Sequence, residues 1–580
     1  MKKITSLLAC LLAFAGLQAQ INITCTNATA EQVLLGNYDP ADYVAPELIR
    51  DPNRITSLIQ EGMSTDTLLS YLQRLSGFRN RNTASDTTSA TEGIGAARRW
   101  VYSKFEEISA DNGNRLLPSY LQFTQTICTA TQHRNVFAVL PGRDTSDLGY
   151  IIIQGHLDSR CEDPCDIDCL AQGAEDNASG TALVIELARI MSQYSFDRTI
   201  VFMATTGEEQ GLFGANAFAR YADRNDMAIK AVLNNDTVGG IICGETSSEP
   251  SCPGLNHIDS TQVRLFSGGS NLSPNKSLAR YIKLQYQDQL QPISQVPMML
   301  TIMSAEDRMG RGGDHIPFRQ RGYPAMRFTA ANEHGNADPS SGNYRDRQHS
   351  VRDILGVDTD GDNIIDSFFV DLNYLARNAA INGVAAAMIS NSPETPSFEL
   401  TEEGGVVMID IADPLNYGRY ALGVRTNQTD FDTLIYSDEP SITFIPRETG
   451  RYYFAVAAVD SFGLESCFSQ EILERIGVLD TSEPESITSV KSVELLPNRP
   501  NPFDDATYLG YWVSEGVQYK DAYILVTDLA GKELRRLPVD LRQGINEVLY
   551  RHGYNVLGTF VYSMVVDGKI VDSRQMIFAN

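Results

Sequence analysis

The chain has 580 residues, 42% of them hydrophobic, and its 73 acidic and 47 basic side chains give a formal charge of −26. This negative surplus argues against nucleic acid and against an anionic membrane surface as binding partners. The length is sufficient for three or four domains, and the composition is that of a globular protein.

Residues 1–19 have the pattern of a secretory signal peptide. Lys2 and Lys3 form a basic start, a mostly apolar run follows, and Ala19 precedes the expected cleavage point. The apolar run is too short to be a stable membrane anchor, and no later run is long enough to span a bilayer. Residues 20–66 show little pattern, and we expect an N-terminal arm or a propeptide there.

From residue 67 to residue 392, short apolar runs alternate with helical patterns. Strands are predicted at 135–142, 150–156, 199–206, 230–236 and 323–330, and helices at 179–194 and 371–389. This alternation predicts an α/β domain with a mixed, largely parallel sheet that is sandwiched by helices.

The C-terminal third of the chain changes to an alternation of apolar and polar residues with a period of two. Residues 393–475 and 492–580 are each predicted to form an all-β sandwich, and the polar stretch 476–491 reads as a linker.

Nine cysteines are present, and eight remain after the expected removal of the signal peptide. Cys243 and Cys252 flank a short polar loop and are expected to pair. Cys161, Cys165 and Cys169 are close enough in sequence to form a metal site, but disulfides in a surface insertion are favoured in a secreted chain.

Acidic side chains and one histidine follow the predicted strands at their C-terminal ends. His156 and Asp158 follow one strand, Glu208 and Glu209 follow another, and Asp236 follows a third, while Asp176 lies in a loop just before a helix. Parallel sheets present their sites at these ends. Because the carboxylates would repel one another, a divalent metal or a pair of metals is the natural compensation, and the donor set suits zinc.

Six motifs in this region resemble those of the zinc aminopeptidase family, namely GHLDS, GAEDNASG, TTGEEQGLFG, NND, GGDHIPF and QHSVRD. Relatives in that family include bacterial leucyl aminopeptidases, glutamate carboxypeptidases and glutaminyl cyclases. The resemblance implies a zinc exopeptidase-like catalytic domain over residues 67–392 and two zinc ions per chain.

The resemblance also implies a role for each matching residue. His156 and Asp236 would hold one zinc, Glu209 and His349 the other, and Asp176 both. His334 remains the rival to His349. Supporting roles next to the ligands would fall to the residues Asp158, Asp314, His315 and Asp353. His156 and Asp158 are two residues apart at a strand end, so the carboxylate of Asp158 is expected to accept the second N–H of His156.

The adjacent glutamates are expected to have different tasks. Glu209 would be a ligand, whereas Glu208 would remain unligated and act as the general base that takes a proton from the attacking water. Some relatives have a tyrosine before the GGDH segment that stabilises the oxyanion, and this chain has none there. Arg308 and Arg311 are the substitutes that the sequence offers.

A second metal pattern occurs in DTDGDNIID. Asp358, Asp360, Asp362 and Asp366 are spaced as in a calcium loop, but the twelfth position is Phe369 rather than glutamate. An acidic solvated turn is the alternative interpretation, so calcium is a candidate cofactor only.

Through the segment YYFAVAAVDSFGLES (452–466), residues 393–475 resemble a fibronectin type III domain. Through the segments LLPNRPNPF, ILVTDLAGKELRRL and GTFVYSMVVDGK, residues 492–580 resemble a type IX secretion sorting domain. The second resemblance implies the type IX secretion machinery as a partner. It also predicts that the protein is secreted from a Gram-negative bacterium or held at its outer surface.

The sequence therefore predicts a dizinc aminopeptidase that acts on the N-termini of peptides or proteins. The alternatives are a glutaminyl cyclase-like enzyme with one zinc, a carboxypeptidase, and a binding module without catalytic activity.

Overall fold

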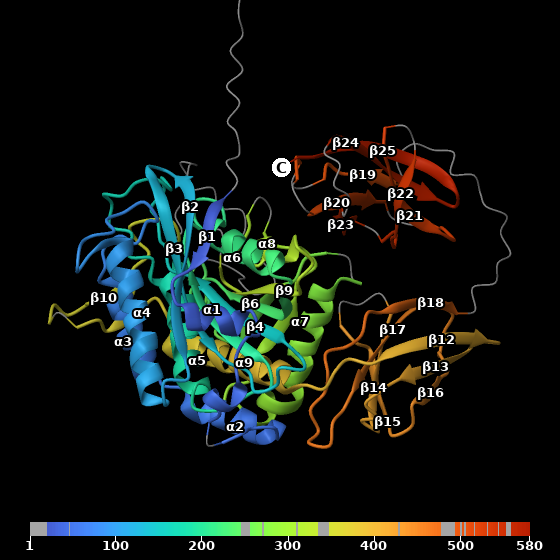
Figure 1. The fold of residues 1–580 in the computed structure, drawn as a ribbon, viewed down its shortest axis with the longest axis horizontal. Helices are drawn as coiled ribbons and strands as arrows, with labels where there is room; N and C mark the ends of the chain where they lie inside the picture. The colour runs from blue at the N-terminus through green and yellow to red at the C-terminus, as the bar shows by residue number, and fades with distance from the viewer. Residues whose placement is uncertain are drawn as a thin grey trace, which may run out of the picture.

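The computed structural model describes residues 20–45, 47–244, 256–269, 272–308, 311–333, 347–362, 364–426, 430–476, 493–498, 501–503, 506–514, 517–529, 532–542, 544–552 and 558–579. Over these residues the chain forms an α/β unit followed by two all-β modules (Figure 1). The signal peptide, most of the linker, Cys252 and His334 lie outside the described residues.

Over the described residues, the α/β unit is built on one mixed sheet of nine strands. In spatial order these are β1 (Ile21–Cys25), β2 (Leu117–Ile127), β3 (Ala130–Leu140), β5 (Thr199–Thr205), β4 (Gly149–His156), β6 (Ala228–Asn235), β9 (Ala325–Ala330), β7 (Gln262–Phe266) and β8 (Met299–Ile302). The strands β5, β4, β6 and β9 are parallel, while β3 runs antiparallel to β5 and β7 antiparallel to β9. Each strand predicted from the sequence overlaps one of these.

Helices cover both faces of this sheet. One face is packed by α2 (Pro52–Gly62), α3 (Thr65–Ser76), α4 (Gly93–Asp111), α5 (Ser179–Met191), α7 (Pro274–Gln285) and α9 (Leu372–Asn391). The other face is packed by α1 (Ala28–Leu34), α6 (Phe213–Arg224) and α8 (Ile316–Arg319). The predicted fold class, a mixed sheet between helices with all-β modules after it, is confirmed.

Strand β4 illustrates why these strands read as continuous apolar runs. Ile151 and Ile153 pack into the core on one side of the sheet, while Tyr150 and Ile152 pack into the core on the other side. Successive side chains of a strand point to opposite faces, so a strand covered on both faces is apolar throughout.

Residues 20–66 contribute directly to the α/β unit. Strand β1 pairs with β2 at the edge of the sheet, and Ile55 and Ile59 of α2 are fully buried in the larger core. The short helix η1 (Pro40–Tyr43) connects these elements. The described part of the unit also contains the short elements η2 (Ala174–Ala178), η3 (Tyr286–Leu290), η4 (Gln291–Ile293), β10 (Gly356–Val357) and β11 (Ser367–Phe368).

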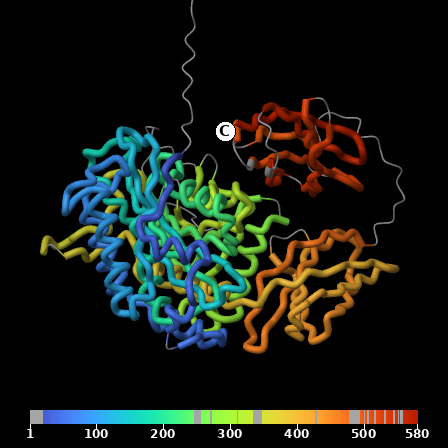
Figure 2. The backbone as a smooth tube through the Cα atoms, in the orientation of Figure 1, coloured from blue at the N-terminus to red at the C-terminus, as the bar shows by residue number. Residues whose placement is uncertain are grey.

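The first β module consists of two facing antiparallel sheets. One contains β12 (Ser397–Glu403), β13 (Val406–Ala412) and β16 (Ser441–Phe444), and the other β15 (Thr433–Ser437), β14 (Tyr420–Arg425), β17 (Gly450–Ala458) and β18 (Ile472–Ile476). Its own core lies between the sheets, but Ala455, Ala457, Leu464 and Phe468 pack into the core of the α/β unit. The module is therefore joined to the α/β unit by buried apolar side chains. Figure 2 shows the backbone of the module beside that of the α/β unit.

The second β module repeats this architecture. One sheet contains β19 (Val493–Leu495), β20 (Ala506–Val513) and β23 (Gly544–Arg551), and the other β22 (Glu533–Pro538), β21 (Ala522–Thr527), β24 (Gly558–Val566) and β25 (Lys569–Phe578). A separate core fills the space between them. Among the helices that the structure describes, none combines the length and the apolar character needed to cross a membrane.

Candidate active site

The turn between β5 and α6 carries Glu208 and Glu209, and a neighbouring strand holds its backbone in place. Asn135 of β3 donates through its side-chain amide to the carbonyl of Gly214 at 2.8 Å and accepts from the N–H of Thr206 at 3.1 Å. A Cβ on Gly214 would lie 2.3 Å from the Asn135 side-chain oxygen, so only glycine fits there. This clamp fixes the direction in which the two glutamates leave the sheet.

His156, Asp176 and Asp236 form the first cluster of donor atoms. Nε2 of His156 lies 3.0 Å from Oδ1 of Asp176 and 3.6 Å from Oδ1 of Asp236. Nδ1 of His156 lies 3.0 Å from the backbone oxygen of Asp158, so it is this nitrogen that carries the proton. The Nε2 lone pair is therefore free to face the two carboxylates, which is the tautomer that a metal ligand requires.

Asp176, Glu209 and His349 form the second cluster. Nε2 of His349 lies 3.0 Å from Oδ2 of Asp176 and 3.2 Å from Oε2 of Glu209. In each cluster, one donor atom from every residue lies within 4.8 Å of the others. The two clusters share Asp176, which presents one oxygen to each histidine.

The residues of both clusters fit a metal. Nε2 of His156, Oδ1 of Asp236 and Oε1 of Glu209 are buried and have no hydrogen-bond partner among the described residues. Buried polar atoms without partners are costly, and buried carboxylates more so. A cation between these atoms would satisfy them, and the combination of imidazole and carboxylate is one that zinc accepts.

The loop that carries Asp176 is fixed by Asp353. The carboxylate of Asp353 accepts hydrogen bonds from the backbone N–H groups of Glu175 at 2.9 Å and Asp176 at 3.0 Å. Burial raises the pKa of Asp353 to about 7. Asp176 lies in the short η2 helix (Ala174–Ala178), and its peptide bond to Asn177 is cis.

The carboxylate of Asp158 binds the backbone of the turn that carries Glu208 and Glu209, rather than the ring of His156. It accepts from the backbone N–H groups of Glu208 at 3.4 Å and Glu209 at 3.2 Å, and from the hydroxyl of Thr83 at 3.1 Å. The sequence predicted that this carboxylate would accept the second N–H of His156. The structure corrects this, because the backbone oxygen of Asp158 is nearer to that nitrogen than the carboxylate, which lies at 3.7 Å.

Asp314 and His315 lie behind the clusters and belong to neither of them. The hydroxyl of Thr205 donates to Asp314, and burial raises the pKa of this carboxyl to about 7. Nε2 of His315 contacts the backbone oxygen of Glu306 at 3.0 Å, and burial lowers its pKa to about 4. His315 is thus a neutral histidine in the wall of the site.

Glu208 and Glu209 have different surroundings. Oε2 of Glu209 contacts His349 and also lies 3.1 Å from Nε of Arg160. The carboxylate of Glu208 makes no hydrogen bond or ion pair with any described residue, and its backbone oxygen accepts from Gly211 and Leu212. Burial raises the pKa of Glu208 well above its usual range, although nearby His156 opposes the shift.

Three polar residues around the clusters were missed in the sequence analysis. Arg160 donates to Nδ1 of His349 at 2.7 Å, and Gln348 donates to Oδ2 of Asp176 at 2.6 Å. Nε of Arg327 lies 3.2 Å from Oδ2 of Asp236. Arg160 directly follows the GHLDS motif at the end of a predicted strand, and this position is the one feature of the sequence that could have pointed to it. The other two are brought in by distant segments.

The two arginines considered for oxyanion stabilisation occupy different positions. Arg308 is buried and pairs with Asp307 at 3.1 Å and with Glu333. Arg311 lies at the clusters, with one guanidinium nitrogen 3.4 Å from each ring nitrogen of His349. Arg311 is therefore the arginine that faces the reacting region.

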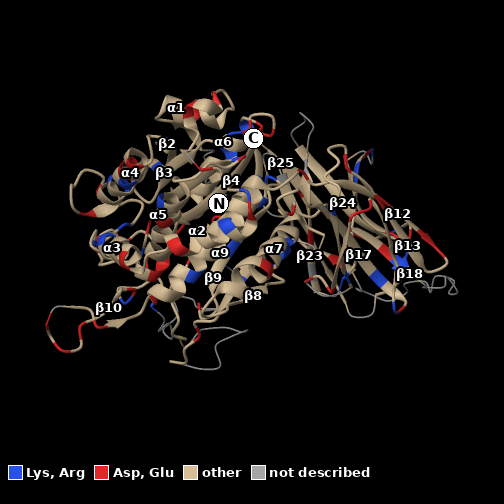
Figure 3. Cartoon of the chain, turned by 90° about the horizontal axis from the view of Figure 1, so that it is seen from below, with Lys and Arg blue, Asp and Glu red and all other residues tan. Residues whose placement is uncertain are grey.

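The DTDGDNIID segment forms an exposed acidic loop. Donor atoms of Asp358, Asp360 and Asp366 lie within 4.8 Å of one another, while Asp362 is not part of this group. Backbone N–H groups of the loop already bond to these carboxylates, for example Gly361 to Asp358 at 2.6 Å. The loop lies beside β10 at the side of the molecule (Figure 3).

Two disulfides brace the loop that carries Arg160. Cys128 is bonded to Cys165, and Cys161 is bonded to Cys169. The three clustered cysteines are thus cross-links, as the preferred interpretation of the sequence had it. Cys243 is also in a disulfide, and its expected partner lies outside the described residues.

The part of the chain that carries both clusters matches a known protein family. Residues 135–361, which carry both clusters, match the model of peptidase family M28. A probable zinc metalloprotease of the fungus Pyricularia oryzae is 32% identical over 392 residues, which cover 64% of this chain and 72% of the relative. The chain belongs to peptidase family M28. It is therefore a peptidase, and the sequence prediction of a zinc-dependent peptidase agrees with this membership.

Other similar proteins include a second fungal relative and several solved structures. A probable zinc metalloprotease of Leptosphaeria maculans is 33% identical over 354 residues, covering 59% of this M28 peptidase and 78% of the relative. The LapA aminopeptidase of Legionella pneumophila has a TM-score of 0.43 at 18% identity, covering 60% of this chain and 77% of that one. The glutaminyl cyclase of Porphyromonas gingivalis has a TM-score of 0.39 at 17% identity, covering 56% and 97%.

The predicted location at a Gram-negative bacterium is wrong in the light of these relatives, because the curated proteins named above come from fungi. The prediction rested on short strand and turn motifs in residues 492–580. Small antiparallel sandwiches contain such segments in proteins that function in different cellular locations. The type IX secretion machinery as a partner depended on the same origin and loses its support with it.

Proposed function

We propose that this M28 peptidase is a zinc aminopeptidase that removes residues from the N-termini of peptides. The proposal is carried by Asp176, whose two oxygens lie 3.0 Å from His156 on one side and 3.0 Å from His349 on the other. A carboxylate shared in this way is a recurrent device of hydrolases that hold two metal ions roughly 3.5–4 Å apart.

The assignment of ligands follows the two clusters. His156 and Asp236 would hold one zinc, Glu209 and His349 the other, and Asp176 both. Bound zinc supplies a Lewis acid for the scissile carbonyl and lowers the pKa of water. The names of the fungal relatives and the partnerless buried donor atoms both support zinc at this place.

The protein's own residues supply the proton transfers. Glu208 has the one carboxylate of the adjacent pair that is free of contacts with the described residues, and it is half-buried at the edge of the clusters. It is placed to accept a proton from the attacking water and to deliver it to the leaving amine. Arg311, beside His349, is the candidate donor to the oxygen of the scissile carbonyl as charge develops there.

A second candidate is an enzyme with one zinc, of the glutaminyl cyclase type, and Arg160 favours it. Arginine can only donate, so its contact with Nδ1 of His349 makes that nitrogen the acceptor and leaves the proton on Nε2. A protonated Nε2 cannot bind a metal. The first cluster has the tautomer that a metal needs, whereas the second requires Arg160 to move and the proton to shift.

A substrate panel with and without a chelator separates these functions. We expect release of the first residue from unblocked peptides, loss of that activity with the chelator, and its return with added zinc. Formation of pyroglutamyl product alone would establish the cyclase. Release from the C-terminus of N-acetylated peptides would establish a carboxypeptidase, and no turnover of any substrate would leave a binding module.

The remaining regions have supporting roles in this proposal. The two disulfides support the proposal that the enzyme acts in an oxidising compartment. The fibronectin type III-like module, residues 393–475 by sequence, would act as a spacer that is fixed to the peptidase unit. The acidic loop at Asp358 carries no metal in this proposal, because its own backbone satisfies its carboxylates.

A further inference from the structure

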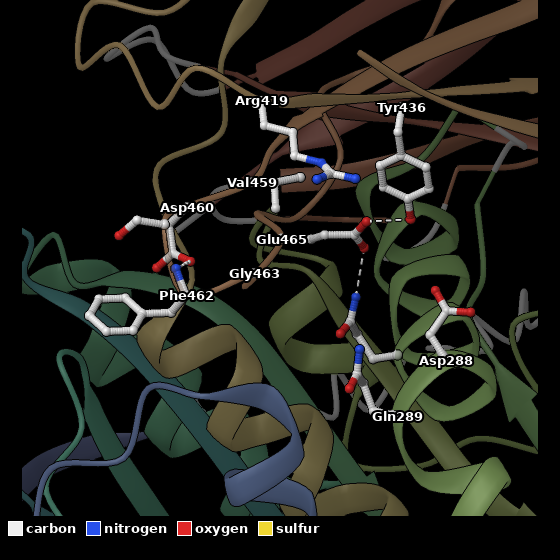
Figure 4. Close-up of a pocket in the computed structure, with 11 residues that line it drawn as sticks. Asp288, Gln289, Arg419, Tyr436, Val459, Asp460, Phe462, Gly463 and Glu465 are labelled. Atoms are coloured by element: carbon white, nitrogen blue, oxygen red, sulfur yellow. Dashed lines mark hydrogen bonds between the residues drawn. The ribbon is translucent and has the colours of Figure 1, made fainter. Parts of the chain in front are cut away.

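A pocket lies between the α/β unit and the first β module, away from the proposed zinc ligands. It has a volume of about 430 Å³, and none of the cluster residues lines it. Gln285 and Asp288, at the end of α7 and in η3, form one wall, and the β module supplies the other. We call it the junction pocket, and its polar lining consists chiefly of Gln285, Asp288, Arg419, Tyr436, Asp460 and Glu465 (Figure 4).

The walls of the junction pocket are held together by buried polar contacts. Glu471 of the β module lies 3.1 Å from Arg280 of α7 and accepts from Arg425 at 2.7 Å. The hydroxyl of Tyr281 in α7 donates to the backbone oxygen of Glu465 at 3.0 Å. The pocket is therefore part of a fixed interface between the α/β unit and the first β module.

Carboxylates dominate the pocket. Asp288, Asp460 and Glu465 line it, and Arg419 is the one cationic side chain in the lining. Glu465 is only 6% exposed, and it is oriented by the hydroxyl of Tyr436 at 2.6 Å and the amide of Gln285 at 2.9 Å. The surplus of negative charge in a partly enclosed space attracts a cationic group.

The pocket also offers contacts for an anionic group and for an apolar stem. Figure 4 shows Arg419 and Tyr436 reaching into the pocket from the β module, with Glu465 between them and the side formed by Asp288. The guanidinium of Arg419 lies 5.7 Å from the centre of the Tyr436 ring, and its contact with Asp438, at 4.0 Å, is exposed and weak. Arg419 is thus available to a carboxylate.

We propose that the junction pocket binds a free cationic amino acid of the arginine or lysine class. The cationic end of the ligand would lie between Asp288 and Glu465, and its α-carboxylate would pair with Arg419. The ring of Tyr436 would cover the aliphatic stem. Arginine-sized ligands fit the volume of the pocket, and no other pocket residue supplies a second site for an anion.

The direct test is binding of L-arginine to the full-length protein, measured by calorimetry in the presence of a chelator. The chelator excludes metal-dependent binding at the proposed active site, and the pocket variants below distinguish the junction pocket from the carboxylates that metal removal leaves there. A failure of the peptidase proposal therefore leaves this result unaffected. We expect saturable binding of L-arginine, weaker binding of agmatine, which lacks the carboxylate, and none of citrulline, which lacks the charge. Citrulline binding equal to that of arginine would overturn the proposal.

Variants then locate the site. Asp288→Asn removes a charge from an exposed residue whose carboxylate makes no hydrogen bond or ion pair with a described residue, and it should weaken arginine binding about tenfold. Arg419→Gln should weaken binding of arginine and leave that of agmatine unchanged. Glu403→Gln, an equal change of charge on an exposed residue of β12 outside the pocket, is the control. Equal effects of the control and Asp288→Asn, or no binding by the wild type at millimolar arginine, would overturn the proposal.

Discussion

The adjacent residues Glu208 and Glu209 differ in what their carboxylates contact, and this difference gives the first prediction. Glu208→Gln removes the proposed proton acceptor and leaves both clusters intact, so we expect the metal content to stay constant and kcat to fall about a hundredfold or more. Glu209→Gln is the matched variant, because it should lower the metal content. Turnover of Glu208→Gln close to that of the wild type would exclude Glu208 as the base.

Arg160 gives the second prediction at this scale. Its guanidinium pairs with Glu209 at 3.1 Å and donates to His349 at 2.7 Å, so it competes with a cation for both ligands. We expect Arg160→Gln to tighten the weaker of two metal sites by about tenfold, a change of about 1.4 kcal/mol. Titration with a chelating indicator measures this affinity.

The control for Arg160 is Arg79→Gln, which removes the same charge from an exposed residue paired loosely with Glu92. It should leave both metal affinities unchanged. If Arg160→Gln instead weakens the second metal, Arg160 supports the ligand set, and the argument for a single-zinc enzyme is removed.

The sequence predicted which residues of the two clusters meet and not what surrounds them. His156 ends β4, and Glu209 and Asp236 follow β5 and β6, which lie on either side of β4, so their convergence followed from the strand pattern. Gln348 and Arg327 reach the same clusters from segments far away in the chain, and no local pattern marks them. Long-range contacts of this kind depend on the packing of whole elements, which periodicity does not encode.

At the scale of elements, α7 carries a lysine with an unusual environment. The ammonium of Lys276 is buried and donates to the backbone oxygen of Met303, and burial lowers its pKa from 10.5 to about 7. The folded protein therefore releases a proton that the unfolded chain retains between these two pH values. Stability contributed by this residue rises with pH from about 7 to about 10, and below pH 7 the buried charge has its full cost.

Lys276→Met should consequently raise the Tm most below pH 7, and the gain should shrink as the pH approaches 10. Loss of the hydrogen bond to Met303 subtracts about 1 kcal/mol at every pH. Thermal unfolding at pH 6, 8 and 10 measures the trend. Lys283→Met, on the same helix but paired with Asp430 and partly exposed, should show no such trend, and a gain that does not depend on pH would contradict the argument.

Elements with strong periodicity were predicted well, and those that depend on neighbours were not. The strands β4 and β5 were found because both of their faces are buried and most of their residues are apolar. The apolar runs of β3, β6 and β9 are interrupted by polar residues, but each is long enough to mark a strand. Strand β1, with the exposed pattern INITC, forms because it pairs with β2. Its sequence has no strong strand signal, so residues 20–66 showed little pattern before the structure placed them.

At the scale of the whole molecule, the second β module contacts the helix that follows Asp314 and His315. The guanidinium of Arg319, at the end of α8, pairs with Glu306 and with Glu547 of the module. The ring of Tyr508 lies 3.7 Å from this guanidinium, and its hydroxyl donates to the backbone oxygen of Arg319. Glu306 in turn supplies the backbone oxygen that His315 contacts.

This chain of contacts predicts that the module supports the active-site wall. Tyr508→Ala combined with Glu547→Gln removes both contacts and should lower the Tm of the peptidase unit and reduce kcat several-fold, while the metal content stays constant. Arg536→Gln, an exposed pair with Glu533 on the far sheet of the module, is the control and should change neither. Unchanged kcat and Tm in the double variant would mean that the second β module stabilises neither the peptidase unit nor its active site.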